Sequence, residues 1–260
     1  MSSGQILLSG EGAVAVVTLE HSAKFNAMSR HMWRQLREAF TRIQAGSEWR
    51  CVLIRGAARN FCSGGDISEY PDFRFNPDAL RAFHEDDVWG GLGAMLACDV
   101  PIIAAIEGNC MGAGVEIACC CDIRVAARTT RFGAPIARLG FPMAPREAAL
   151  VAHVGGEATA REMLLEAAVL DATEMKARGF LHAVVDEHEL MAHASARAAR
   201  VANLAPQAAR LNKQTLRALS AVHRAPPLEE LVPDAYAYAD SAEHREGIQA
   251  FLDKRKPQFF

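Results

Sequence analysis

Apolar and polar positions follow two different periods along this chain. Short apolar runs rich in β-branched residues predict buried strands at residues 14–19, 51–54, 102–106 and 123–125. Apolar residues recur at helical spacing between a Ser29 cap and Gly46, and again over residues 80–95. A short helix is expected after Gly114. Strands that alternate with glycine turns and helices favour an α/β core.

The pattern changes in the C-terminal part of the chain. From about Glu157 onward the sequence is rich in alanine, and its pattern is almost entirely helical, with clear helical segments at residues 195–204, 206–219 and 242–252. We therefore predict an α/β core over residues 1–195 and a helical C-terminal region over residues 196–260. No low-complexity linker marks the boundary between them.

Two glycine-rich segments, residues 61–67 and 108–116, each follow an apolar run directly. Glycine tolerates strained dihedral angles and has no Cβ, so such turns leave backbone N–H groups open to a ligand. Two N–H groups that converge on one oxygen would stabilise negative charge that develops there during a reaction. Glu116 places a titratable carboxyl group beside the second turn, between Val115 and Ile117, where burial would raise its pKa toward the working pH.

Composition excludes several classes of protein. A net charge of −3 gives no reason to expect a nucleic-acid partner. Charged residues interrupt the most apolar region, residues 101–127, which argues against a membrane span. Seven cysteines, an odd number, do not form a recognisable disulfide framework, and no secretory signal precedes the first strand. These features predict a cytoplasmic protein.

Motifs for other chemistries are missing. His188, Glu189 and His193 have the wrong spacing for a zinc-binding His-Glu-x-x-His helix, and the cysteines show no paired C-x-x-C spacing. No Walker lysine follows a glycine loop, and no G-x-S-x-G elbow is present. We expect no metal and no redox cofactor.

Four segments, in order along nearly the whole chain, resemble the enoyl-CoA hydratase/isomerase (crotonase) family: residues 21–28, 61–67, 101–122 and 246–257. The first lacks the proline that the family usually has there. The resemblance implies an acyl-CoA thioester substrate, with coenzyme A as part of the substrate. It also implies a spiral of strand-strand-helix units and a C-terminal helical region that assembles a homo-trimer or a hexamer.

The resemblance assigns roles to individual residues. The family's oxyanion donors match the backbone N–H groups of Gly65 and Ala113, and its first catalytic glutamate matches Glu116. Together these residues imply an enolate of the thioester, with Glu116 transferring a proton at the α or γ carbon. Substrate-binding positions fall on Lys24, Ser63, Asp66, Ile67, Gly112 and Ile136. Lys24 would lie along the CoA, and Ser63 would lie near its adenine. Asp66 is more typical of a residue that caps the following helix than of a catalytic group.

One position departs from the family. The second glutamate of the hydratases should follow Pro135, where this chain has Ile136. Hydration uses two carboxyl groups, so a double-bond isomerase that uses one carboxylate is an alternative. A second alternative is a non-catalytic acyl-CoA binder or scaffold protein on the same fold. His84 and Glu147 are further candidates near the acyl group, although both residue types are more often surface groups.

Overall fold

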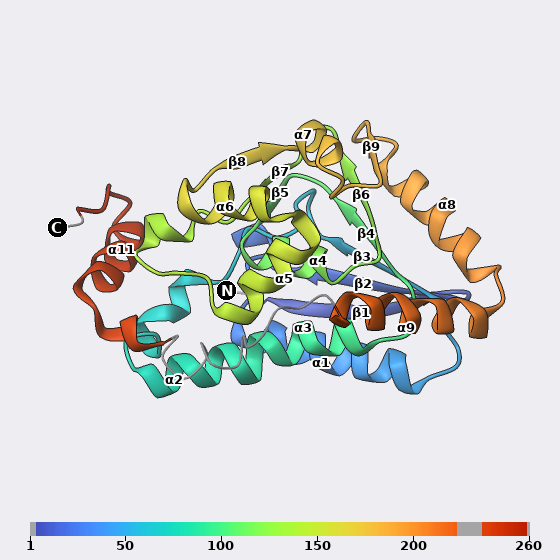
Figure 1. Ribbon diagram of the computed structural model, residues 1–260, viewed down its shortest axis with the longest axis horizontal. Helices are drawn as coiled ribbons and strands as arrows, with labels where there is room; N and C mark the ends of the chain where they lie inside the picture. Colours follow the sequence, from blue (N-terminus) through green and yellow to red (C-terminus); the bar gives the residue numbers. More distant parts are fainter. Residues whose placement is uncertain (1–3, 223–235, 259–260) are drawn as a thin grey trace.

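The computed structural model describes residues 4–222 and 236–258 (Figure 1). Its centre is a six-stranded sheet of strand order β1-β2-β3-β4-β6-β9. The strands are β1 Gln5–Glu11, β2 Val14–Glu20, β3 Cys51–Gly56, β4 Ile102–Ile106, β6 Ile123–Ala127 and β9 Ala183–Val185. The β1–β2 pair is antiparallel, and the other pairs are parallel. All five residues of β4 are buried, as expected for a central parallel strand that is covered on both faces.

A second sheet of three short strands lies beside the first. Its order is β5-β7-β8, formed by β5 Asn109–Met111, β7 Arg131–Gly133 and β8 Val169–Asp171. The strands β8 and β9 both lie after Glu157, where the sequence pattern is almost entirely helical. The pattern does not reveal them, because each strand is only three residues long and so shows too little periodicity to be detected.

Helices cover both faces of the large sheet (Figure 1). On one face, α1 Arg30–Ala45 packs against α3 Trp89–Ala97, and α2 Pro77–Ala82 leads into α3 through a π-helical turn, Phe83–Val88. Ser29 caps α1 and Gly46 ends it, as predicted. On the other face, α8 Leu190–Ala202 packs on β3, β4 and β6. The predicted boundary at residue 195 falls inside this helix, and the division into core and C-terminal region remains a prediction.

The remaining helices surround the second sheet and the two ends of the molecule. They are α4 Ala113–Cys119, α5 Pro145–Gly155, α6 Glu157–Leu165, α7 Ala172–Ala177, α9 Pro206–Val222 and α11 Ala242–Leu252. Single 3-10 turns occur at Ser22–Lys24, Ile67–Asp72, Ile136–Leu139 and Ala237–Asp240. Among the described residues, no helix is both long enough and apolar enough to cross a membrane. Residues 223–235 of the predicted C-terminal region lie outside the described residues.

Candidate active site

Backbone hydrogen bonds hold the two glycine turns side by side. Cys62 N donates to Asn109 O at 2.9 Å, and Met111 N donates to Cys62 O at 2.9 Å. A Cβ on Gly114 would lie only 2.6 Å from Cys62 O, so this close approach requires glycine. Two segments that are about fifty residues apart in the sequence therefore meet at one edge of the molecule's core.

Each turn presents a backbone donor. Within the described residues, neither Gly65 N–H nor Ala113 N–H donates a hydrogen bond to another group. Ala113 is the first residue of α4, where helical geometry leaves N–H groups without a partner. Gly112, which precedes it, has a φ of 46°, and a Cβ there would lie 3.7 Å from the Gly64 Cα. The two N–H groups thus belong to turns in van der Waals contact.

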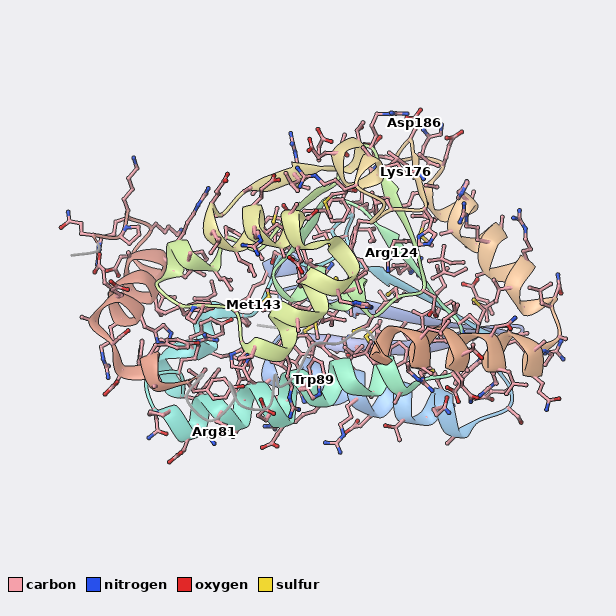
Figure 2. All side chains as sticks on the ribbon, in the orientation of Figure 1. Arg81, Trp89, Arg124, Met143, Lys176 and Asp186 are labelled. Carbon is pink, nitrogen blue, oxygen red and sulfur yellow. The ribbon has the colours of Figure 1, made fainter. Side chains whose placement is uncertain are left out.

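Both turns border a cavity of about 610 Å³. It is also lined by Met143, labelled in Figure 2, on the loop before α5. Every site residue predicted from the sequence lines this cavity: Lys24, Ser63, Gly65, Asp66, Ile67, Gly112, Ala113, Glu116 and Ile136. The fold therefore brings all nine positions to one place, although their individual roles remain predictions.

Glu116 lies in the first turn of α4 and is 9 % exposed. Burial and the negative charge of Glu147 raise the pKa of Glu116 to about 8, and the opposing charge of Arg74 does not offset them. No residue of the described chain forms a hydrogen bond or ion pair with the Glu116 carboxyl group, so it is neither a helix cap nor half of a salt bridge. A carboxyl group poised near neutral pH on a cavity wall is suited to proton transfer.

Ile136 begins the 3-10 turn Ile136–Leu139 and contributes an apolar wall to the cavity. A different carboxyl group lies in this neighbourhood: Glu147 of α5 is 3 % exposed, and its Oε1 lies 3.0 Å from Nδ1 of His84. His84 lines the cavity, and its Nε2 is buried without a hydrogen-bond partner among the described groups. Glu147 is therefore not a surface residue. It acts on Glu116 through its charge.

Lys24 and Asp66 form an ion pair beside the first turn. Lys24 Nζ lies 2.7 Å from Asp66 Oδ2, and the lysine side chain is 38 % exposed. Burial alone would raise the pKa of Asp66, but hydrogen bonds from Lys24 and Ser68 outweigh it and lower the pKa. Asp66 also caps the turn Ile67–Asp72, as expected. Ser63 Oγ donates to Lys24 O at 2.9 Å, which fixes the lysine segment against the turn.

Among the cavity residues that sequence reasoning missed are Tyr70 and Arg74. Both lie in the stretch before α2 that shows no clear periodicity. Tyr70 is 6 % exposed and Arg74 is 1 % exposed. Only the folded chain shows that these residues are buried, because nothing in the local pattern separates them from an ordinary loop.

Residues 9–260 match the model of the enoyl-CoA hydratase/isomerase family. The chain belongs to this family. A probable enoyl-CoA hydratase of Mycobacterium bovis is 30 % identical, over 100 % of this chain and 99 % of the relative. A solved enoyl-CoA hydratase/carnithine racemase from Magnetospirillum magneticum is 38 % identical, with a TM-score of 0.82 over 100 % of this chain and 96 % of the other.

A third relative has a different activity in its name. The solved methylmalonyl-CoA decarboxylase in complex with 2S-carboxypropyl CoA is 27 % identical, with a TM-score of 0.87 over 100 % of this chain and 99 % of the other. The α/β architecture described above is thus the crotonase fold. The family acts on acyl-CoA thioesters, and its members catalyse more than one reaction.

Proposed function

We propose that this protein is an acyl-CoA enzyme of the hydratase/isomerase type that works through an enolate of the thioester. The N–H groups of Gly65 and Ala113 would both donate to the thioester oxygen. Glu116 would remove a proton from the α carbon as the C–H electrons move onto that oxygen. The observation that carries the proposal is one cavity that holds two unpaired N–H donors and a buried carboxyl group with a pKa of about 8.

The apolar wall at Ile136 favours a reaction that one carboxyl group can complete. In a double-bond isomerisation, Glu116 takes a proton from the α carbon of a 3-enoyl-CoA and returns it at the γ carbon. Hydration of a 2-enoyl-CoA needs a further group to activate water. The proposal needs no metal or redox cofactor, because the acidity of the thioester and the two donors suffice. Coenzyme A enters only as part of the substrate.

The proposal is tested by NMR of crotonyl-CoA and of a 3-enoyl-CoA incubated with the protein in deuterated water. We expect deuterium at the α carbon together with double-bond migration or hydroxyl addition. The Glu116→Gln variant should lose all of these while it retains affinity for the ester. Glu38→Gln, which changes an exposed carboxylate on α1, serves as the matched control and should behave as wild type.

Binding of both esters without exchange of the α proton would refute the enzyme and support a non-catalytic acyl-CoA binder. Full activity in Glu116→Gln would refute the role of that residue. Hydroxyacyl product would show that a group other than residue 136 activates water.

We also propose that the protein is a homo-trimer or a hexamer. Leu211 and Leu219 of α9 and Phe251 of α11 are each more than half exposed, at 52 %, 56 % and 53 %. Exposed apolar side chains on helices are typical of surfaces that are buried between subunits. Sedimentation equilibrium should give three or six times the mass of 28.2 kDa, and a monomer would contradict this proposal.

A further inference from the structure

A buried cation lies in the wall of the acyl cavity. Arg74, between the turn Ile67–Asp72 and α2, is 1 % exposed and borders the cavity. Two other cavity residues are also cationic, but their environments differ. Lys24 is paired with Asp66, and Arg138 is exposed to solvent. Of these three cations, Arg74 is the one that is buried, and it forms no ion pair with a carboxylate of the described chain.

The groups that hold Arg74 are neutral. Its Nε donates to Nε2 of His244 at 3.3 Å, and its Nη2 donates to the Tyr238 hydroxyl at 3.2 Å. Its guanidinium carbon lies 4.3 Å from the ring centroid of Tyr70 and 4.0 Å from that of Phe141. Burial lowers the pKa of His244 to about 4, so at neutral pH this imidazole accepts the hydrogen bond without a charge of its own.

No carboxylate of the described chain lies within 4.0 Å of Arg74. The charge of Arg74 acts on Glu116 at a distance, but no hydrogen bond or ion pair joins the two side chains. Within residues 4–222 and 236–258, the Nη1 group of Arg74 donates no hydrogen bond. Buried charges in proteins are nearly always paired, so this arrangement fits a site whose anion arrives with the ligand.

We propose that Arg74 binds a second carboxylate on the acyl group, which makes the substrate a short carboxyacyl-CoA. The inference rests on the proposed acyl-CoA function and deepens it. A guanidinium is the side chain best suited to a carboxylate, since its planar fork can donate two hydrogen bonds. With Nε and Nη2 donating to neutral groups, Nη1 is the part of the guanidinium that remains available for such an anion.

Tyr70 indicates how long the acyl group is. A Cβ on Gly65 would collide with the Tyr70 hydroxyl, so that hydroxyl lies against the oxyanion turn. The guanidinium of Arg74 lies over the ring of the same tyrosine. A single tyrosine side chain therefore separates the position of the thioester oxygen from the cation. This spacing fits acyl groups whose second carboxylate lies a few bonds from the thioester, such as succinyl or glutaryl.

Isothermal titration calorimetry of the wild-type protein tests the inference with two esters of nearly equal shape. We expect succinyl-CoA to bind at least tenfold more tightly than 4-methylpentanoyl-CoA, in which an isopropyl group replaces the carboxylate. Arg74→Gln should abolish this preference. Arg138→Gln, which changes the exposed cavity arginine, is the matched control and should keep it. Circular dichroism checks that each variant is folded, and the wild-type comparison stands even if Arg74→Gln does not fold.

Different results would refute the carboxylate site and the acyl-CoA function. If wild-type protein binds both esters equally, or prefers 4-methylpentanoyl-CoA, the carboxylate site is refuted while the acyl-CoA function stands. If the preference survives in Arg74→Gln and is lost in Arg138→Gln, Arg74 is the wrong residue. If neither ester nor crotonyl-CoA binds, the proposed function itself is refuted.

Discussion

Replacing Glu116 with glutamine should stabilise the protein at alkaline pH while it abolishes activity. The pKa of Glu116 is about 8 in the folded protein and 4.5 for an ordinary glutamate, because burial and Glu147 disfavour its charged form. An acid whose pKa is raised on folding binds more protons in the folded state than in the unfolded state. Stability of the wild type should therefore fall as pH rises from about 4.5 to about 8. Glutamine carries no charge at any pH and should remove this loss.

The size of the effect follows from the same two pKa values. A pKa difference of one corresponds to about 1.4 kcal/mol, so the interval from 4.5 to about 8 sets an upper bound of ~5 kcal/mol. The carboxyl group borders a cavity that water can enter, and this screens part of its charge. We therefore expect Glu116→Gln to gain about 2–3 kcal/mol relative to wild type between pH 5 and pH 9, most of it between pH 6 and pH 8.

Urea unfolding at a fixed protein concentration, repeated at each pH, measures this difference. Glu38→Gln on the exposed face of α1 is the control, and its unfolding free energy should stay parallel to that of the wild type. Parallel curves for Glu116→Gln and wild type over the whole range would refute the reasoning. Such a result would mean that the carboxyl group is solvated, and Glu116 would then not be poised for proton transfer near neutral pH.

Three further predictions concern the same cavity. Gly112→Ala should lower kcat on the order of 100-fold with little change in Kd, because strain at a φ of 46° displaces the Ala113 N–H. The control is Gly179→Ala, which has a φ of 83° and open space around it, and this variant should be strained but active. Glu147→Gln should lower the pKa of Glu116, so the rate of α-proton exchange should reach its plateau at a lower pH than in wild type, and an unchanged pH profile would contradict the coupling between the two groups. Lys24→Met should raise KM for CoA esters several-fold but leave KM for N-acetylcysteamine thioesters unchanged, since only the former carry phosphates for the lysine to bind, and an equal rise for both would place Lys24 elsewhere.

Much of the fold was readable from local sequence. The buried strands β2, β3, β4 and β6 are short runs of apolar residues, and α1 begins at its predicted serine cap and ends at its predicted glycine. These features depend on neighbours within a few positions, so periodicity reveals them. The strand β1, with mostly exposed residues, was not predicted, and neither were β8 and β9.

Some features of the candidate site are likewise readable from local sequence, and others depend on tertiary packing. Sequence alone located both glycine turns and Glu116, because a turn that must keep an N–H group open requires glycine whatever surrounds it. It gave Glu147 and His84 only as minor candidates, of residue types more often found at the surface, and passed over Arg74, since burial is a property of the packed chain and not of the residue type. The apolar neighbours Val115 and Ile117 already predict a raised pKa for Glu116. Only the tertiary structure joined Glu147 to His84, brought the charge of Glu147 to act on Glu116 and placed Arg74 against the rings of Tyr70 and Phe141. Charge in a protein interior is decided by which groups from distant segments exclude water around it, and local sequence does not contain that information.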